Sequence, residues 1–515
     1  MYFALLFSFL AFANFATPQS WSIFDSYNQE WSSIHRDVCI VGGGSSGIHA
    51  AVSLKDSGKT VVVVERNNYL GGHAHTYFKS NTPVDFGVVI FQPIPELPND
   101  RNALFITGNS YANFEISYSY FERFSVRMLN LKSPEVIPNI PGHPANKSLP
   151  AVLYATNYES RDFRDGSKVN PTAFSDTEVS AAFAMTTNLL ANYKYLLHGY
   201  DMPDPVPEDL YLPYGAFVKK YHLEAAFPKL FHWAGGLGDV FHLPAIYVLK
   251  YFNAEVILYG FKLGHITPAS GSTHELYAKA GDFIGADNIF LESNVIATNR
   301  KASSSTGTAE LLVSTKDSGL KLLNCKKILL TIPPTLTNLR GWDLTPAEHS
   351  VFSQFTTSNG YWTGLVTNVG LNQTVAILNN AAHTPGNVPI FPALYELQPV
   401  GVLDDVWHIK FGANNPTMTT EQVKSYVESE IAILQKAYNV PVTKPEWLVM
   451  DSHTPFHLQV SPEAIKNGFY NELQKLQGGL GGTMFYSGAA FHTQSSSLLW
   501  RFNKEVVLPM MMKSF

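Results

Sequence analysis

Residues 37–66, DVCIVGGGSSGIHAAVSLKDSGKTVVVVER, place a glycine cluster between two short apolar segments. The segment DVCIV (37–41) is apolar enough for a strand that is buried on both faces. Small and apolar residues recur at helical spacing over 45–55, Gly58 ends that helix, and TVVVV (60–64) predicts a second buried strand. This order of strand, glycine turn, helix and strand is typical of a dinucleotide-binding βαβ unit.

Three glycines of the cluster, Gly42, Gly44 and Gly47, form a Gly-x-Gly-x-x-Gly motif. In such a motif the first glycine permits the tight turn, the second lets the backbone approach a pyrophosphate, and the third lets the helix pack closely on the strand. Free N–H groups at the helix N-terminus bind the phosphates. Glu65 ends the second strand, where a carboxylate accepts hydrogen bonds from ribose hydroxyls and repels the 2′-phosphate of NADP. The alternative is a glycine-rich turn without a ligand.

The residues after Glu65 help to separate FAD from NAD, which the glycine motif alone does not do. Gly71 and Gly72 follow the acidic strand end, and VDFG follows at 84–87. This arrangement resembles the second signature of FAD-binding oxidoreductases, in which a double glycine passes the pyrophosphate. In the flavin-containing amine oxidoreductase group an arginine usually follows the double glycine, whereas here His73 follows it. The departure removes one cation from the phosphate region.

Two distant segments extend this resemblance. In the strand-like segment NIFLESNVIATNRK (288–301), Val295 matches the residue that holds the FAD adenine through its backbone in the group. The segment MFYSGAAFHTQSSSLLWRFNKEVVLP (484–509) resembles the last FAD-binding segment, in which a strand leads to glycine and alanine. A new helix is expected to begin around residues 495–497, with its N-terminus toward the flavin N1 and C2 carbonyl.

Together these motifs resemble the fungal branch of the flavin-containing amine oxidoreductase superfamily, close to β-cyclopiazonate dehydrogenase-like proteins. The resemblance implies FAD as the cofactor and an α/β fold. That fold is a Rossmann-type FAD-binding domain, like that of glutathione reductase, with an α+β substrate domain inserted in the chain. The predicted cofactor-binding residues are Gly42, Gly43, Gly44, Ser46, Gly47, Glu65, Arg66, Gly71, Gly72, His73, Val295, Gly488, Ala489 and Ser496.

The predicted FAD-binding domain is discontinuous, with its parts at 36–95, 260–335 and 455–515. The intervening blocks, 96–259 and 336–454, mix helical and strand-like patterns and predict one substrate domain, an antiparallel sheet with covering helices. Residues 91–114 fit neither pattern. The glycine-rich GGLGD (235–239) has no buried strand before it, so we interpret it as a loop rather than as a second phosphate site.

The predicted catalytic residues are Tyr361, Trp362 and His73. Many amine oxidases carry a lysine on a substrate-domain strand that holds water near flavin N5. The best match here, NGYWTGLVTNVG (359–370), has no lysine. Its two aromatic residues are interpreted either as an apolar wall against the substrate or as core residues.

Three histidines, His73, His75 and His492, stand next to the cofactor segments. A histidine at such a place could donate a hydrogen bond to flavin, act as a base, or form a covalent link to the flavin 8α-methyl group, although most histidines do none of these. The pair of His73 and His75 has no third ligand nearby in the sequence, so no metal is expected.

Three functions are compatible with these motifs. The first is an FAD-dependent dehydrogenase or oxidase that transfers hydride from an apolar amine, or from a C–H or C–N bond of a natural product, to flavin N5. Dioxygen or another acceptor would then reoxidise the flavin. The second is a flavin-dependent double-bond isomerase or desaturase, and the third is a non-catalytic secreted flavin-fold binding protein. The expected ligand is a small molecule in each case.

Composition and the N-terminus bear on location. The net charge of −6 provides no basic field for nucleic acid. Residues 1–17 are predicted to be a secretory signal peptide, because their uncharged apolar run is shorter than the roughly 20 residues that cross a bilayer and ends in small residues. A buried core helix is the alternative. Sequons at Asn146 and Asn372 are compatible with a secreted glycoprotein.

Cys39 and Cys325 are expected to be unpaired core residues, since a large core needs no disulfide.

Overall fold

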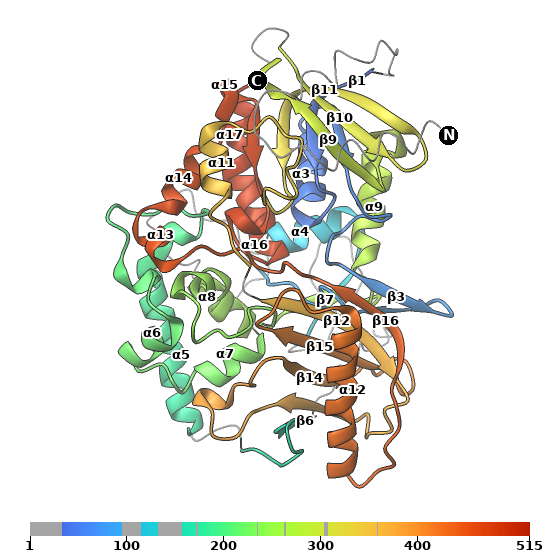
Figure 1. Ribbon diagram of the computed structural model, residues 1–515, viewed down its shortest axis with the longest axis vertical. Helices are drawn as coiled ribbons and strands as arrows, with labels where there is room; N and C mark the ends of the chain where they lie inside the picture. Colours follow the sequence, from blue (N-terminus) through green and yellow to red (C-terminus); the bar gives the residue numbers. More distant parts are fainter. Residues whose placement is uncertain are drawn as a thin grey trace.

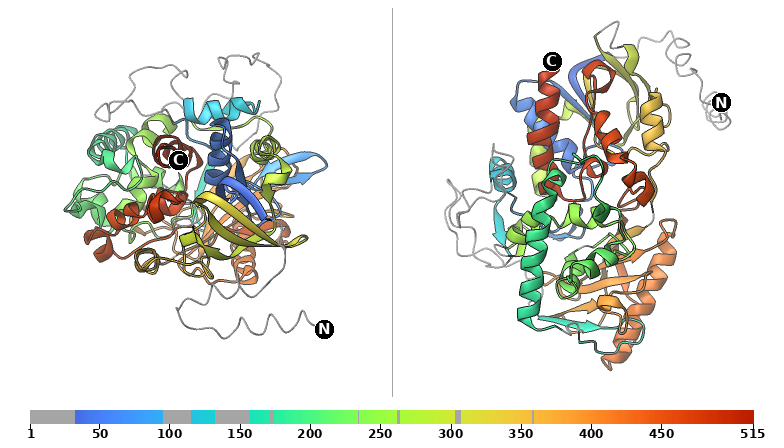
Figure 2. Two further views of the ribbon diagram at one scale, coloured as in Figure 1. Left: turned by 90° about the horizontal axis from the view of Figure 1, so that it is seen from above. Right: turned by 90° about the vertical axis from the view of Figure 1, so that its left-hand side faces the viewer.

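Two large β-sheets lie at opposite ends of the molecule, with helices beside and between them (Figures 1 and 2). The structure is a computed structural model that describes residues 33–94, 115–131, 157–170, 174–233, 235–261, 264–302, 307–357 and 359–515. The predicted signal peptide, Asn146 and most of the segment 91–114 lie outside the described residues. Among the helices that are described, none is long and hydrophobic enough to span a bilayer.

Within the described residues, the first sheet has seven strands, in the order β8-β2-β1-β11-β10-β9, with β17 paired to β11. The strands are β1 (Ser33–Val41), β2 (Val61–Val64), β8 (Ile289–Phe290), β9 (Ser293–Asn299), β10 (Ala309–Thr315), β11 (Gly319–Leu330) and β17 (Met484–Tyr486). Strands β8, β2, β1, β11 and β17 are parallel to their neighbours in this set, and β10 is antiparallel to both β11 and β9. The helix α3 (Ser45–Asp56) joins β1 to β2, which confirms the predicted βαβ unit. The fold is the predicted flavin fold of the Rossmann type.

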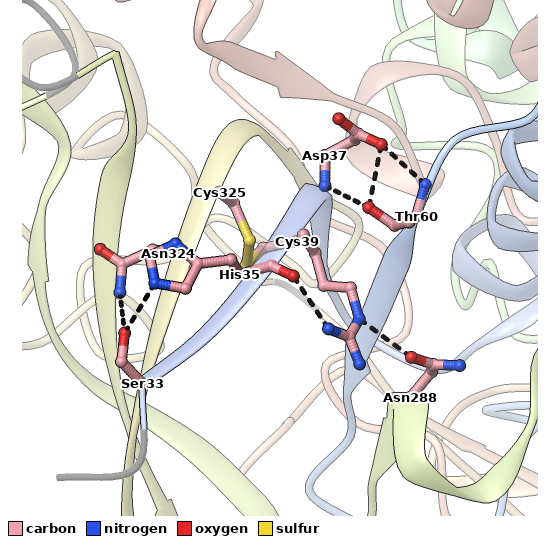
Figure 3. Close-up of a disulfide and its surroundings, with 9 residues drawn as sticks. Ser33, His35, Asp37, Cys39, Thr60, Asn288, Asn324 and Cys325 are labelled. Atoms are coloured by element: carbon pink, nitrogen blue, oxygen red, sulfur yellow. Dashed lines mark hydrogen bonds between the residues drawn. A yellow bond between two sulfur atoms is a disulfide. The ribbon is translucent and has the colours of Figure 1, made fainter.

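Cys39 and Cys325 form a disulfide, so the prediction that both cysteines are unpaired is wrong (Figure 3). The two residues lie on the adjacent parallel strands β1 and β11. Their Cα atoms are 5.7 Å apart, which is a separation that a disulfide spans. Both side chains are fully buried. The prediction was based on the size of the core alone. The cysteines pair because the strand order places β1 beside β11.

The second sheet has the order β16-β12-β15-β14-β13-β6, six strands in the part of the chain that the structure describes. The strands are β6 (Asn157–Arg161), β12 (Gly360–Thr367), β13 (Val375–Asn379), β14 (Ala393–Pro399), β15 (Trp407–Ala413) and β16 (Glu446–Ser452). All pairs are antiparallel except that of β13 with β6. The long helix α12 (Thr420–Ala437) lies along this sheet (Figure 1). It begins with a capping box at Thr419 and Gln422, and it buries Val423, Val427 and Ile431 against the sheet.

The remaining helices fill the space beside and between the two sheets (Figure 2). They include α4 (Glu115–Arg123), α5 (Asp176–Leu190), α6 (Tyr214–Lys220), α7 (Phe227–Trp233), α8 (Ala245–Tyr251), α9 (His274–Ile284) and α16 (Ser496–Phe502). Helix α4 belongs to the block assigned to the substrate domain, yet it packs on α16, where the rings of Tyr120 and Trp500 are 4.8 Å apart. One hydrophobic core therefore joins the first sheet to helices of the substrate block, and the second sheet and α12 share a separate core.

Candidate cofactor and substrate site

The carboxyl ends of four parallel strands meet at one edge of the first sheet. After β1, the N–H of Gly42 donates to the Val64 carbonyl of β2 at 2.9 Å. After β11, the N–H of Thr331 donates to the Val41 carbonyl at 2.9 Å, and after β17 the N–H of Ser487 donates to the Leu330 carbonyl at 2.9 Å. Ligands of open α/β sheets bind outside this edge. All the predicted glycine segments converge there.

Close packing requires glycine at two positions of the loop, Gly42 and Gly47, but not at Gly44. A Cβ on Gly47 would lie 2.0 Å from the Gly42 carbonyl oxygen, and one on Gly42, whose φ is +113°, would lie 2.5 Å from Thr331 Oγ1. In contrast, a Cβ on Gly44 would meet nothing closer than the Cα of Gly72, at 3.7 Å. Gly44 and Gly72 therefore lie in close contact, since a Cβ on Gly72 would in turn lie only 3.1 Å from the Gly44 Cα. Helix α3 begins beside this contact without a side-chain cap, so its first N–H groups fit a pyrophosphate.

Glu65 is buried at the same edge and holds the loop by hydrogen bonds. Its Oε2 accepts from the N–H of Gly43 at 2.7 Å, and its Oε1 accepts from the N–H of Asn67 at 2.8 Å. Each carboxylate oxygen has a further lone pair, which can accept from a ribose hydroxyl. The Glu65 carbonyl accepts from Ser293 at 2.9 Å, which places the start of β9, and with it the half-buried Val295, beside the acidic residue. The side chain of Arg66 is exposed.

The C-terminal segment closes the other side of the glycine loop. Gly488 has φ +90°, and a Cβ there would lie 2.7 Å from the Thr331 carbonyl oxygen. Helix α16 begins at Ser496, as predicted, with Ser495 as its cap. Trp500 Nε1 donates to Ser45 Oγ at 2.9 Å, and so ties α16 to the first turn of α3. Ser46 and Ser487 are joined at 2.7 Å between their Oγ atoms, so the Ser46 side chain contacts protein.

Two of the three candidate histidines meet at the border between the two sheets, where they stack on His453 from the segment after β16. The ring centroids of His73 and His453 are 4.2 Å apart with an interplanar angle of 9°. The rings of His75 and His453 are 5.1 Å apart at 24°. His492 is elsewhere: its Nε2 lies 3.2 Å from the Leu197 carbonyl oxygen among helices of the substrate block.

The stacked imidazoles are neutral at ordinary pH. Burial, followed by the charges of His75 and Arg66, lowers the pKa of His73 to about 4. Burial and then the neighbouring His73 and His75 hold the pKa of His453 well below its usual range. For His75 burial lowers the pKa, against the raising effect of Asp451, whose Oδ2 is 3.4 Å from His75 Nδ1. The cluster can therefore provide hydrogen bonds without a net charge.

The same rings do not form a metal site. Their faces stack, so their nitrogen lone pairs do not converge on one point. Across the described ranges, no group of three or more histidine, cysteine, aspartate and glutamate residues has an arrangement that could hold a metal ion.

Tyr361 and Trp362, adjacent on β12, point to opposite faces of the second sheet. Tyr361 faces the first sheet, with its ring 5.6 Å from that of His453 and 4.9 Å from that of Phe456. Trp362 lies in the core under α12, with its ring 6.0 Å from that of Phe411. The structure thus places Trp362 where the core interpretation predicts it, and Tyr361 alone is beside the histidines.

The sequence analysis missed three features of this face. Strand β15 carries Lys410, which is paired with Thr363 of β12 and therefore lies on the face of Tyr361. Its Nζ donates to Glu396 Oε1 at 2.7 Å. The second feature is His453. The predicted domain boundary at 454 assigned it to the substrate domain, whereas its neighbours His73 and Phe456 were assigned to the FAD-binding domain. The signal for Lys410 was a lysine inside the strand-like segment VWHIKFGA (406–413). The sequence did not reveal that this strand pairs with β12.

The third missed feature is the position of the glycine-rich loop 235–239, which was predicted as a loop and which packs against the aromatic residues of this face. A Cβ on Gly236 would lie 2.3 Å from the Phe456 ring. The N–H of Gly238 donates to the hydroxyl of Tyr395 at 3.0 Å. The loop follows helix α7 and not a strand, so it is not a second phosphate site, but it does form part of the wall around Tyr361.

Comparison with known proteins agrees with this geometry. The model of the NAD(P)-binding Rossmann-like domain matches residues 40–104. The chain is 34% identical over 488 residues to the FAD-dependent oxidoreductase oblC of Cochliobolus heterostrophus, covering 92% of this chain and 91% of that protein. It is also 34% identical over 481 residues to the beta-cyclopiazonate dehydrogenase of Aspergillus oryzae, covering 92% of each. Among solved structures, the CLA-producing fatty acid isomerase from P. acnes has a TM-score of 0.68 at 17% identity, covering 92% of this chain and 98% of that one.

Proposed function

The chain belongs to the family of FAD-dependent oxidoreductases that includes oblC and beta-cyclopiazonate dehydrogenase, and from this premise we propose that it oxidises an apolar small molecule, an amine or another natural product. It is therefore an FAD-dependent enzyme, and the hypothesis of a non-catalytic binding protein is dropped. When bound, FAD would accept hydride from a C–H or C–N bond of the substrate at its N5 and return the electrons to dioxygen or another acceptor.

The observation that supports an apolar substrate is the aromatic cluster on the face of the second sheet that points to the first. Tyr361 lies at its centre, with its ring 6.1 Å from that of Tyr395 and 4.9 Å from that of Phe456. Such rings provide a large apolar surface with only a few polar atoms, which is how small-molecule sites orient apolar ligands. The neighbouring imidazoles are neutral, so the cluster favours an uncharged form of the substrate.

A second candidate function is a double-bond isomerase or desaturase. Strand β12 carries no lysine, and Lys410 on the neighbouring strand is engaged with Glu396. A lysine bound in this way is a weaker support for a water held at the flavin than a free lysine would be. The solved fatty acid isomerase shares the fold, and an isomerase remains the alternative that the assay below distinguishes.

The assay uses purified, FAD-loaded protein and a panel of apolar amines, indoles and unsaturated acids. An oxidase or dehydrogenase substrate is expected to bleach the flavin without oxygen, and an oxidase substrate also releases hydrogen peroxide in air. Conversion with no bleaching and no net oxygen consumption would instead identify an isomerase. Tyr361→Leu is expected to reduce kcat/KM about tenfold or more without loss of flavin, because it removes a buried aromatic contact. Tyr426→Leu is the control, since Tyr426 is exposed on α12.

We also propose that the protein is exported and that residues 1–17 are removed. The disulfide between Cys39 and Cys325 supports this proposal, because such bonds persist mainly in oxidising compartments. Asn372 is exposed in the described part of the chain, where a glycan would be tolerated. The N-terminus of protein recovered from culture medium is expected to start between about residues 14 and 20. An intact Met1 on protein found only inside cells would contradict export.

A further inference from the structure

Two short turns beside the second sheet share the sequence pattern Asn-x-Thr and the same local structure. Residues 372–374, NQT, lie immediately before β13, and residues 415–417, NPT, lie between β15 and α12. In both turns the asparagine and the threonine are exposed to solvent. The second sheet therefore presents two triplets that differ only in their middle residue.

In each turn the asparagine side chain is hydrogen-bonded to the threonine two residues later. The Oδ1 atom of Asn372 accepts from the backbone N–H of Thr374 at 3.0 Å and from its hydroxyl at 2.9 Å. The Oδ1 atom of Asn415 accepts the same two hydrogen bonds from Thr417, at 2.9 and 2.7 Å. Three consecutive residues form such a turn by themselves, so it can also form in a chain that has not yet folded.

The middle residue separates the two turns chemically. An Asn-x-Ser or Asn-x-Thr triplet is an acceptor for N-linked glycosylation unless its middle residue is proline. Proline fixes its own φ and restricts the backbone of the residue before it. Exposure and hydrogen bonding are alike in the two turns, so Pro416 is the feature that distinguishes Asn415 from Asn372.

Asn372 lies at the end of the second sheet that is remote from the aromatic cluster. Tyr361 is near the start of β12, and the stretch from Tyr361 to Thr367 extends roughly 20 Å at the usual rise of a strand. The register of β13 through β14 and β15 keeps the start of β13, and with it Asn372, at the Thr367 end of β12. A glycan on Asn372 would therefore leave the face of Tyr361 open.

We propose that Asn372 is a site of N-linked glycosylation and that Pro416 alone bars Asn415 from the same modification. In the transfer, Asn372 Nδ2 forms a bond to the anomeric carbon of a lipid-linked diphospho-oligosaccharide and loses one proton. The bond from that carbon to the phosphate oxygen breaks, and the lipid diphosphate leaves with the electron pair. The proposal rests on the export proposed above and is independent of the redox reaction.

The test compares the wild type with Asn372→Gln and Pro416→Ala in a fungal host. Each chain is produced once with its own N-terminus and once with residues 1–17 replaced by the leader of a secreted fungal protein. The added leader delivers the chain to the secretory pathway whether or not its own N-terminus does so. Peptide N-glycosidase converts a glycosylated asparagine to aspartate, so mass spectrometry of the peptides measures each asparagine separately.

Asn372 is expected to be glycosylated in most molecules of the secreted wild type, and Asn415 to be unmodified. Asn372→Gln is expected to lose one glycan and to keep the wild-type kcat/KM. Pro416→Ala is expected to gain a glycan on Asn415, because the exposure and the turn are already present.

An unmodified Asn372 in wild-type protein that is secreted through the added leader would overturn the proposal. An unmodified Asn415 in secreted Pro416→Ala would overturn the role given to Pro416. Wild-type peptides decide the first point even if a variant fails to fold. Protein with its own N-terminus that stays unmodified inside cells would contradict export alone, because the added leader tests Asn372 separately.

Discussion

Gly44→Val is expected to yield a folded, colourless protein that retains no FAD. The backbone of Gly44 has φ −74° and ψ −176°, which any residue adopts, and a Cβ would be in ordinary contact with Gly72 at 3.7 Å. The valine methyl groups would cover the backbone of the two glycines, which must approach the pyrophosphate. We expect FAD affinity to fall at least about a hundredfold, which corresponds to ~3 kcal/mol.

The ratio of flavin to protein after purification measures this loss, and circular dichroism verifies the fold. Two other glycines provide controls. Gly479→Ala is expected to behave as the wild type, because nothing lies within 4 Å of the new Cβ. Gly47→Ala is expected to disrupt folding, because its Cβ would lie 2.0 Å from the Gly42 carbonyl oxygen. A Gly44→Val protein with full flavin content would show that the pyrophosphate does not pass this loop.

Removal of the disulfide by the double substitution Cys39→Ala and Cys325→Ala is expected to destabilise the fold by ~4 kcal/mol, near the upper part of the usual range. The two cysteines are 286 residues apart, so the bond closes a long loop in the unfolded chain. It also joins β1, which leads into the glycine loop, to β11 (Figure 3). Denaturant unfolding is expected to show a lower midpoint for the variant than for the wild type.

The single substitutions separate the crosslink from the packing of the sulfur atoms. Each removes one sulfur and the whole crosslink, so all three variants should unfold at similar denaturant concentrations. Both sulfurs are fully buried, so a reductant should leave the folded wild type intact and act only once the protein unfolds. Equal midpoints for the wild type and the double variant would show that the crosslink contributes nothing to stability.

The cofactor half of the site could be predicted because its signals are local. Glycines at fixed spacing, two apolar strands and an acidic strand end lie within residues 37–66, and each has a backbone reason that a sequence displays directly. The patterns of the block 336–454 likewise indicated helical and strand-like segments, and the structure has α12, β12 and β15 there. The resemblance to flavin enzymes then extended these local motifs to the C-terminal segment, where α16 begins at the expected residue.

Sequence alone determined the dinucleotide loop, its acid and the strands and helices around them, whereas the tertiary structure decided which distant residues become neighbours. Strand alternation indicates that Tyr361 and Trp362 point to opposite faces, but only sheet packing shows that Tyr361 packs against Phe456 and that Trp362 lies under α12. The tertiary structure likewise decides the pairing of Cys39 with Cys325 and the stacking of His453 on His73. These contacts join residues hundreds of positions apart, and strand order, which no local pattern encodes, brings them together.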